Sequence, residues 1–201
     1  MQACRLAARD LACRRGDRIL FRNLSLSLAP GDALQVTGPN GTGKSSLIRI
    51  LAGLLRPYAG SVEREGRIAL IDERMALDAH VPLERALAFW GRVDGVMERV
   101  TALGLDDLLD VPVRYLSTGQ KKRAALARVA ASGASVWMLD EPLNGLDVDW
   151  AKRAQHMIEL HRAAGGIAVI ASHLPLALDG LQVLSIADHV PDERAGAEAD
   201  E

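Results

Sequence analysis

The sequence predicts an α/β fold: a parallel sheet flanked by helices, with an antiparallel β region on its N-terminal side and an inserted helical block. Three observations predict it. Apolar and polar residues alternate from Arg5 to Leu28, short apolar strands alternate with helical patterns after Ala33, and residues 74–132 show mostly helical patterns. The order strand, helix, strand, helix, strand favours parallel strands joined by right-handed crossovers. We expect a single domain over residues 1–201, because this length suits one domain better than two.

The first third of the chain predicts strands on either side of one helix. Alternating apolar residues indicate strands, and glycine, proline and aspartate mark the turns between them. The predicted elements are two or three antiparallel strands within Arg5–Leu28, a strand from Ala33 to Thr37, a helix from Lys44 to Leu54, and a strand pair within Ser61–Ile71 that turns at Glu65–Gly66.

The rest of the chain predicts the helical block, inserted at residues 74–132, and then a return to strands. The predicted elements are helices over 82–93, 96–103 and 118–131, a strand over 136–140, a helix from about Asp147 to Ala164, and strands over 166–172 and 181–186. The acidic tail, residues 190–201, is expected to be frayed, because such a sequence buries little apolar surface.

Composition and charge exclude several classes of function. A hydrophobic content of 49% can form a core, and a net charge of −2 argues against a general nucleic-acid binder. No apolar run of about 18 residues is present and the N-terminus has no apolar signal core, so we expect a cytoplasmic chain, soluble or bound to a membrane partner. Cys4 and Cys13 lack metal-binding spacing and are expected to be reduced, partly buried cysteines.

A glycine-rich loop between a strand and a helix carries the strongest chemical signal. The stretch G-P-N-G-T-G-K-S fits the phosphate-loop pattern GxxxxGK[ST] in full, and its strand and helix context argues against a chance glycine-rich turn. Glycines let backbone N–H groups converge on phosphate oxygens, and the helix points its positive end at them. The pattern predicts that Lys44 reaches the β- and γ-phosphates and that Ser45 ligates Mg²⁺. The predicted nucleotide-binding residues are Gly38, Pro39, Asn40, Gly41, Thr42, Gly43, Lys44, Ser45 and Ser46.

A pair of carboxylates follows the apolar strand V-W-M-L-D. Asp140 and Glu141 are expected at the carboxyl edge of the sheet, beside the phosphate loop. Asp140 is predicted to hold Mg²⁺ through water, and Glu141 to orient or deprotonate the attacking water. A solvated Asp-Glu turn before a proline is the alternative, but the phosphate loop favours hydrolysis. Asp147, in N-G-L-D, can cap the next helix, reach another subunit, or do both.

His173 is the histidine that follows a buried strand, in I-A-S-H. This position puts it on the same sheet edge as the carboxylates, where an imidazole can hydrogen-bond a γ-phosphate oxygen. A lone histidine is more often structural, but its place beside the other elements favours a role in the site. His80, His156 and His161 are expected on the surface, and His189 at the start of the tail.

The segment Y-L-S-T-G-Q-K-K-R begins a predicted helix. Ser117 is expected to be the N-cap of a helix that starts at Thr118, and this alone is an adequate structural reason for the segment. The same helix start, with the Ser117 hydroxyl and the Gly119 N–H, is also suited to an anion. Because the helix belongs to the inserted block, its start need not lie near the chain's own phosphate loop.

Five ordered motifs resemble the nucleotide-binding subunits of ABC transporters: G-P-N-G-T-G-K-S, L-S-T-G-Q, W-M-L-D-E-P, N-G-L-D and A-S-H. The resemblance implies a P-loop NTPase fold with a RecA-like parallel sheet, with ATP and Mg²⁺ as ligands. It also implies a second copy of the chain, with two ATP molecules sandwiched head to tail in a dimer that opens after hydrolysis. The signature residues expected to meet the partner's ATP are Leu116, Ser117, Thr118, Gly119 and Gln120, and the D-loop residue is Asp147.

The chain departs from the family pattern at three places. Thr118 replaces the usual second glycine of the signature. Glu73 stands where the Q-loop glutamine is expected, and a carboxylate there can bind Mg²⁺ or water but repels phosphate. Arg14 or Arg15 stands where an aromatic residue usually stacks on adenine, and a guanidinium plane can also stack on a base.

Three further stretches resemble the cytochrome c maturation branch of the family: C-R-R-G-D-R-I-L-F, D-E-P-L-N-G-L-D and G-G-I-A-V-I-A-S-H-L-P-L. This resemblance implies a peripheral ATPase on the cytoplasmic face of a bacterial inner membrane, with an integral-membrane subunit and haem-handling partners and no nucleic acid. An ABC exporter of another cargo and a soluble ABC-type assembly factor are the alternatives. A P-loop kinase would have no use for L-S-T-G-Q.

Overall fold

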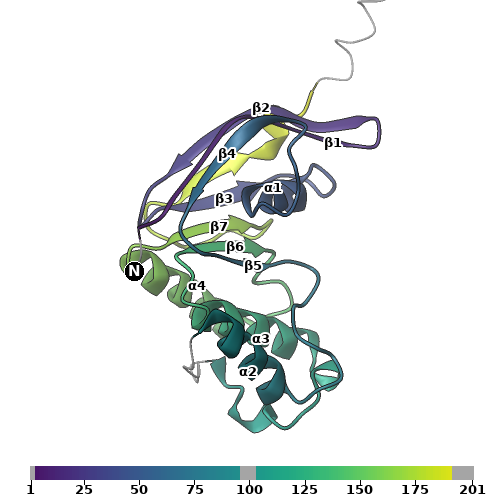
Figure 1. Cartoon of the computed structure of the whole chain (residues 1–201), viewed down its shortest axis with the longest axis vertical. Coiled ribbons are helices and arrows are strands. Elements are labelled where there is room, and N and C mark those ends of the chain that lie inside the picture. Colours follow the sequence, from purple (N-terminus) through teal and green to yellow (C-terminus); the bar gives the residue numbers. More distant parts are fainter. Residues whose placement is uncertain (1–2, 96–102, 192–201) are drawn as a thin grey trace, which may run out of the picture.

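Two sheets organise the computed structural model, which describes residues 3–95 and 103–191 (Figure 1). An antiparallel sheet has the order β2-β1-β4, and a parallel sheet has the order β5-β6-β7-β3-β8. The predicted α/β fold is therefore confirmed. The strands are β1 (Arg5–Arg15), β2 (Arg18–Leu28), β3 (Ala33–Thr37), β4 (Ala59–Glu65), β5 (Ile68–Ile71), β6 (Val136–Asp140), β7 (Ile167–Ala171) and β8 (Gln182–Ser185).

Helices cover the parallel sheet and form the separate lower block of Figure 1. The helices are α1 (Lys44–Leu51), α2 (Leu83–Asp94), α3 (Thr118–Ala131) and α4 (Val148–Ala163), with 3-10 turns at η2 (Asp106–Leu108), η3 (Val113–Tyr115) and η4 (Ile186–His189). Residues 96–102 of the helix predicted over 96–103, and residues 192–201 of the tail predicted over 190–201, lie outside the described residues.

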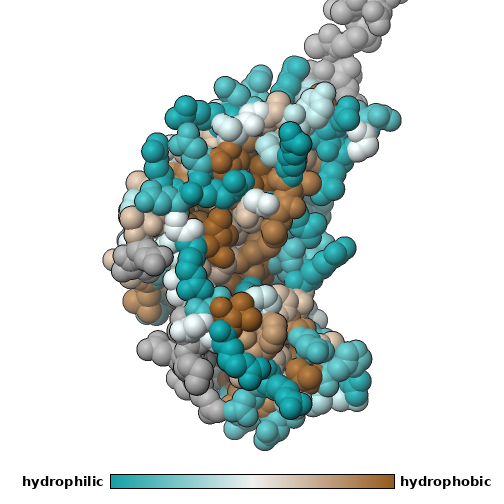
Figure 2. Space-filling model, in the orientation of Figure 1, coloured by the Kyte–Doolittle hydropathy of each residue, from teal (hydrophilic) through white to brown (hydrophobic). Residues whose placement is uncertain are grey.

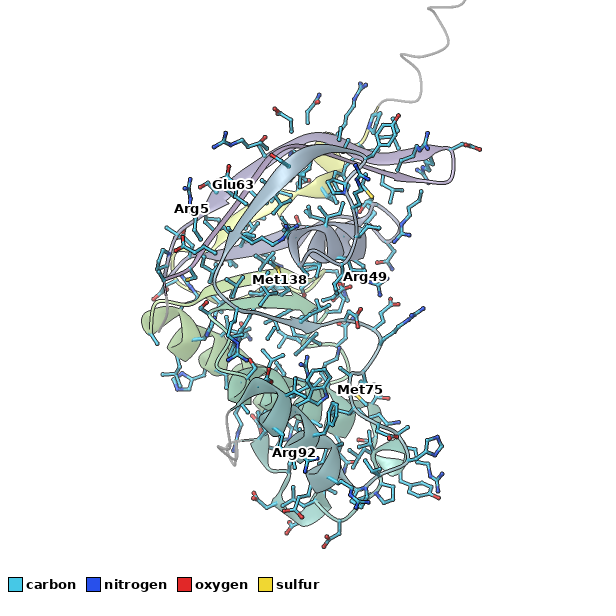
Figure 3. All side chains as sticks on the ribbon, viewed as in Figure 1. Arg5, Arg49, Glu63, Met75, Arg92 and Met138 are labelled. Atoms are coloured by element: carbon cyan, nitrogen blue, oxygen red, sulfur yellow. The ribbon has the colours of Figure 1, made fainter. Side chains whose placement is uncertain are left out.

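The parallel sheet separates two hydrophobic cores. Along β6, Val136 and Met138 face the core that α1 shares with the antiparallel sheet, whereas Trp137 and Leu139 face the core beneath α3 and α4. Figure 3 shows Met138 in the interior, where it is fully buried. Burial on both faces explains why this strand is apolar throughout rather than alternating.

The strand pair predicted within Ser61–Ile71 is wrong in its pairing. Both strands exist, but β4 pairs with β1 in the antiparallel sheet and β5 pairs with β6 in the parallel sheet. Gly66 connects the two sheets with a backbone φ of +98°. A Cβ at this position would lie 2.3 Å from Ser135 Oγ. A short glycine-containing segment between two strands predicts a hairpin. Here the same segment links the exposed β4 of one sheet to the half-buried β5 of the other.

His161 is buried, which corrects its prediction as a surface residue. Its ring stacks on Trp137 with the centroids 3.9 Å apart, and Nε2 lies 3.2 Å from the Ile167 carbonyl oxygen. A Cβ at Gly166 would lie 2.3 Å from this ring, so glycine is needed there. Burial, only partly opposed by the hydrogen bonds to backbone carbonyls, lowers the pKa of His161 from 6.5 to about 4.

We expect His161 to make folding stability fall with acidity. A histidine whose pKa is lowered by folding binds a proton more readily in the unfolded chain, so its contribution is present above pH 6.5 and is lost as the pH falls towards about 4. The full loss is up to about 3 kcal/mol. Urea unfolding between pH 7 and pH 4.5 measures it, with His161→Phe as the control that keeps the stack on Trp137. Equal pH dependence in both proteins would contradict the assignment.

Candidate active site

The phosphate loop connects β3 to α1 in a conformation that requires its glycines. Gly38, Gly41 and Gly43 have φ values of +141°, +81° and +105°, and a Cβ at Gly38 would lie 2.7 Å from Ile186 Cγ2. Gly43 is the N-cap of α1 and provides no side-chain cap, so the first N–H groups of the helix keep no side-chain partner at that position. This leaves them available to phosphate oxygens.

Lys44 folds over this loop. Its Nζ donates to the carbonyl oxygens of Gly38 at 2.7 Å and Pro39 at 3.1 Å, and Thr42 Oγ1 donates to the same Pro39 oxygen at 2.8 Å. The ammonium is nearly buried, with 7% of the residue exposed. A phosphate that binds in the loop can therefore replace these carbonyl groups as the partner of the ammonium.

Asp140 ends β6 and is buried beside the phosphate loop. Burial is the largest cause that raises its pKa, the Ser45 hydroxyl opposes this through a hydrogen bond, and the carboxylates of Glu141, Glu73 and Asp72 raise it further. A buried carboxylate in such a negative setting favours a nearby cation. Among residues 3–95 and 103–191, no group of three or more His, Cys, Asp or Glu could hold a metal ion. Mg²⁺ at nucleotide sites needs only one or two protein ligands, so Ser45 and Asp140 fit it.

Glu141 and His173 meet at the carboxyl edge of β6 and β7, as predicted. His173 Nδ1 lies 3.2 Å and 3.1 Å from the two carboxylate oxygens of Glu141. The Glu141 backbone has φ +48°, an uncommon value for a residue other than glycine, and its N–H donates to the Ala171 carbonyl oxygen at 2.8 Å. Nδ1 therefore orients the carboxylate, and the histidine remains partly exposed on the same edge.

Lys122 is a candidate site residue that the sequence reasoning missed. It lies on α3, where burial lowers the pKa of its ammonium and the carboxylates of Asp140, Glu141, Asp72 and Glu73 oppose that shift. The cation thus interacts electrostatically with the carboxylates at the catalytic edge, Glu73 among them. The pair K-K after L-S-T-G-Q was the available signal. Neighbouring residues on a helix point in different directions, so one of the two lysines could be expected to turn away from solvent.

The start of α3 forms a capping box, which confirms Ser117 as its N-cap. Ser117 Oγ accepts from Gln120 N at 3.2 Å, and Gln120 Oε1 accepts from Ser117 N at 2.8 Å. Leu116 is buried, whereas Ser117 and Thr118 are exposed. The helix start is therefore rigid and open to solvent, which suits contact with a molecule outside this chain.

Asp147 caps α4, because its Oδ1 accepts from Trp150 N at 2.9 Å. The helix-capping prediction is confirmed, and contact with another subunit stays a prediction. At the predicted adenine position, the Arg14 guanidinium lies over the Tyr58 ring, 4.8 Å from its centroid. Since Arg14 already stacks on Tyr58, the exposed Arg15 is the better candidate to stack on a base.

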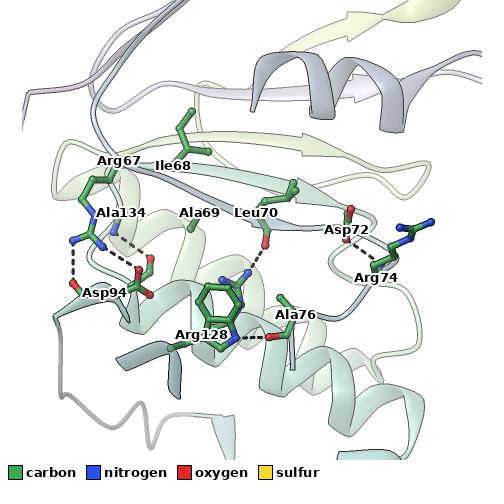
Figure 4. Close-up of a pocket in the computed structure, with 12 residues that line it drawn as sticks. Arg67, Ile68, Ala69, Leu70, Asp72, Arg74, Ala76, Asp94, Arg128 and Ala134 are labelled. Carbon is green, nitrogen blue, oxygen red and sulfur yellow. Dashed lines mark hydrogen bonds and ion pairs between the residues drawn. The ribbon is translucent and has the colours of Figure 1, made fainter. Parts of the chain in front are cut away.

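A separate pocket of 380 Å³ lies between β5, α2 and the second half of α3 (Figure 4). Arg128 donates to the Leu70 carbonyl oxygen and lies over the Trp90 ring, 4.9 Å from its centroid, while Trp90 donates to the Ala76 carbonyl oxygen. Asp72 also lines this pocket, and the next residue along the chain is Glu73, the Q-loop position. In Figure 2, apolar surface runs from the middle of the face down to the helical block.

The chain belongs to the ABC transporter family, and within it to the ATP-hydrolysing subunits. The family model described as ABC transporter matches residues 21–144. Among curated relatives, the chain is 66% identical to the "Cytochrome c biogenesis ATP-binding export protein CcmA" of Novosphingobium aromaticivorans, over 95% of this chain and all of that protein. The protein of the same name from Zymomonas mobilis is 50% identical, with 92% of this chain and 86% of that protein covered.

A solved structure shows the same fold. The "Putative ABC transporter (ATP-binding protein)" from Pyrococcus furiosus superimposes with a TM-score of 0.80 at 21% identity, covering 93% of this chain and 100% of the other. The described residues include no helix with the length and apolar character needed to cross a membrane.

Proposed function

We propose that this chain hydrolyses ATP to drive an export step of cytochrome c biogenesis, as a pair of identical subunits bound to a membrane protein. The observation that carries the proposal is a site in two parts. A phosphate loop and a Glu141–His173 pair meet at one sheet edge, while a rigid signature helix start lies exposed on the helical block. The 66% identity to a cytochrome c biogenesis protein supports the cellular role.

ATP binds with its phosphates in the loop from Gly38 to Ser46. Lys44 exchanges the loop carbonyl groups for β- and γ-phosphate oxygens, and the N–H groups at the start of α1 point at the same oxygens. Ser45 and Asp140 hold Mg²⁺, which supplies positive charge against the phosphates when it is bound. Arg15 stacks on the adenine.

Hydrolysis uses the Glu141–His173 pair. Glu141 takes a proton from a water molecule as the water oxygen attacks the γ-phosphorus, and the bond to the β–γ bridging oxygen breaks, which leaves ADP and phosphate. His173 donates from Nδ1 to the carboxylate, and when both ring nitrogens carry a proton Nε2 also donates to a γ-phosphate oxygen. Lys122 adds a positive charge that limits repulsion among the carboxylates around this edge.

A second copy completes each site. Ser117 and Gly119 at the start of α3 bind the γ-phosphate of the partner's ATP, and Asp147 lies at the same interface. Two ATP molecules are then enclosed between two chains, so ATP binding favours the closed dimer and hydrolysis releases it.

The pocket between β5 and the helical block is the proposed contact for the membrane subunit. Its mouth includes Asp72, next to Glu73 at the Q-loop position, and Arg49 on α1 pairs with Asp72 at 3.0 Å. A segment that enters this pocket would therefore contact the loop that leads to the catalytic edge. In this proposal the chain is bound peripherally at the cytoplasmic face of the inner membrane.

Covalent haem in c-type cytochromes measures the proposed cellular function. In bacteria that lack this gene, we expect the wild-type chain to restore haem-stained cytochrome c, and Lys44→Ala to restore none while it still sediments with membranes. Arg74→Glu, at the exposed mouth of the pocket, should release the chain from membranes, with Arg92→Glu on α2 as the matched control. Normal haem staining without the gene would contradict the role in cytochrome c biogenesis.

A further inference from the structure

The start of α3 and the loop after Glu141 touch with no space between them. A Cβ at Gly119 would lie 2.7 Å from the Gly145 carbonyl oxygen, a distance that real Cβ atoms essentially never show. In the opposite direction, a Cβ at Gly145 would lie 3.1 Å from Thr118 Cγ2. The threonine that replaces the usual signature glycine thus points its methyl group towards the side of Gly145 where a Cβ would lie.

The touched loop leads directly to two residues of the proposed reaction. Between Glu141 and Asp147 the chain makes consecutive turns: Asn144 N donates to the Glu141 carbonyl oxygen at 3.4 Å, and Leu146 N donates to the Leu143 carbonyl oxygen at 3.1 Å. Asp147 then caps α4. Because the turns leave little slack, a shift of Gly145 changes the position of Glu141 on one side and of Asp147 on the other.

A second contact joins α3 to the start of α4, about one and a half turns after Thr118. The Arg123 guanidinium of α3 lies 4.2 Å from the centroid of the Trp150 ring at the start of α4, with Arg153 on that ring at 4.7 Å. Arg123 also donates to the carbonyl oxygens of Leu103 and Gly104, both at 2.9 Å. The contacts at Thr118 and at Arg123 therefore both hold the first turns of α3 against the segment from Gly145 to Trp150.

We propose that Thr118 is a positioning residue whose methyl group fixes the loop from Glu141 to Asp147 against the start of α3. The inference rests on the proposed two-chain site. When Ser117 and Gly119 bind the partner's γ-phosphate, the contact transmits the position of α3 to this chain's own Glu141. The two ATP sites of a dimer are thereby linked through each chain. Thr118 strengthens this link by holding the loop from Glu141 to Asp147 in position.

Two conservative variants separate the methyl group from the hydroxyl group. Thr118→Ser removes the methyl group that faces Gly145, whereas Thr118→Val keeps a methyl group there and removes the hydroxyl. We expect Thr118→Ser to lower kcat by about two- to fourfold, because fourfold is the limit for one fully buried methyl group and Thr118 is partly open to solvent. KM for ATP and ATP binding to the isolated chain should stay unchanged, because the phosphate loop is untouched. Thr118→Val, which keeps a methyl group towards Gly145, should lower kcat less than Thr118→Ser does.

The outcomes distinguish this inference from the proposed function. Turnover per wild-type chain that does not rise with protein concentration would overturn the two-chain site, and this inference with it. If wild-type turnover does rise, wild-type kcat in Thr118→Ser would overturn the role of the methyl group alone. A loss in Thr118→Val as large as in Thr118→Ser would assign the effect to the hydroxyl, and so would also overturn it. Thermal unfolding of each variant shows whether the loss reflects unfolding.

Discussion

Glu141→Gln is expected to reduce ATP turnover by about 100- to 1,000-fold and to accumulate an ATP-bound dimer. The amide has the shape of the carboxylate but cannot accept the proton of the attacking water. It also removes one negative charge from an edge where Asp140 and Glu141 already repel each other, so the closed state with its γ-phosphate becomes more stable. Steady-state phosphate release and size-exclusion chromatography with and without ATP measure the two effects.

Glu63→Gln is the matched control, because Glu63 is an exposed carboxylate on the antiparallel sheet, paired with Arg9 at 3.6 Å. It should turn over ATP like the wild-type protein and remain monomeric after hydrolysis is complete. A Glu141→Gln protein with near-normal turnover would remove Glu141 from its proposed role, and a fully inactive protein that never dimerises with ATP would contradict the sandwich.

The parallel sheet and its functional edge could be predicted because local pattern and site chemistry coincide there. A strand buried on both faces is apolar throughout, and parallel strands bring their carboxyl ends together, so Asp140, Glu141 and His173 could be placed at one edge before any coordinates. The Glu141–His173 contact confirms that placement. The predicted pairing of β4 with β5 is wrong, because Glu65–Gly66 gives the same local signal in a hairpin and in a link between sheets.

Side chains whose environment comes from distant segments could not be predicted in this way. His161 is buried by the stack on Trp137, and the helical pattern around it gives no sign of that partner. Lys122 interacts electrostatically with the carboxylates at 72–73 and 140–141, which lie in other segments of the chain. In both cases the surroundings of the side chain depend on how α3 and α4 pack on the sheet, and local sequence patterns do not reveal that packing.

Ser117→Arg is expected to lower turnover by about 100-fold or more while ATP binding to the isolated chain is unchanged. Ser117 is the exposed N-cap of α3, on the helical block. A long cation at this position removes the hydroxyl and obstructs the helix start, so the partner's γ-phosphate loses its contact. Ser27→Arg, an exposed serine on β2, is the control and should keep wild-type turnover.

A mixture of two inactive proteins tests whether the site is shared. Lys44→Ala lacks a working phosphate loop and Ser117→Arg lacks a working signature, but a mixed dimer combines the phosphate loop of one with the signature of the other. An equal mixture should regain at most about a quarter of wild-type turnover, because half of the dimers are mixed and each has one intact site of two. If every site belonged to a single chain, mixing could restore nothing, and turnover would remain that of the two separate proteins.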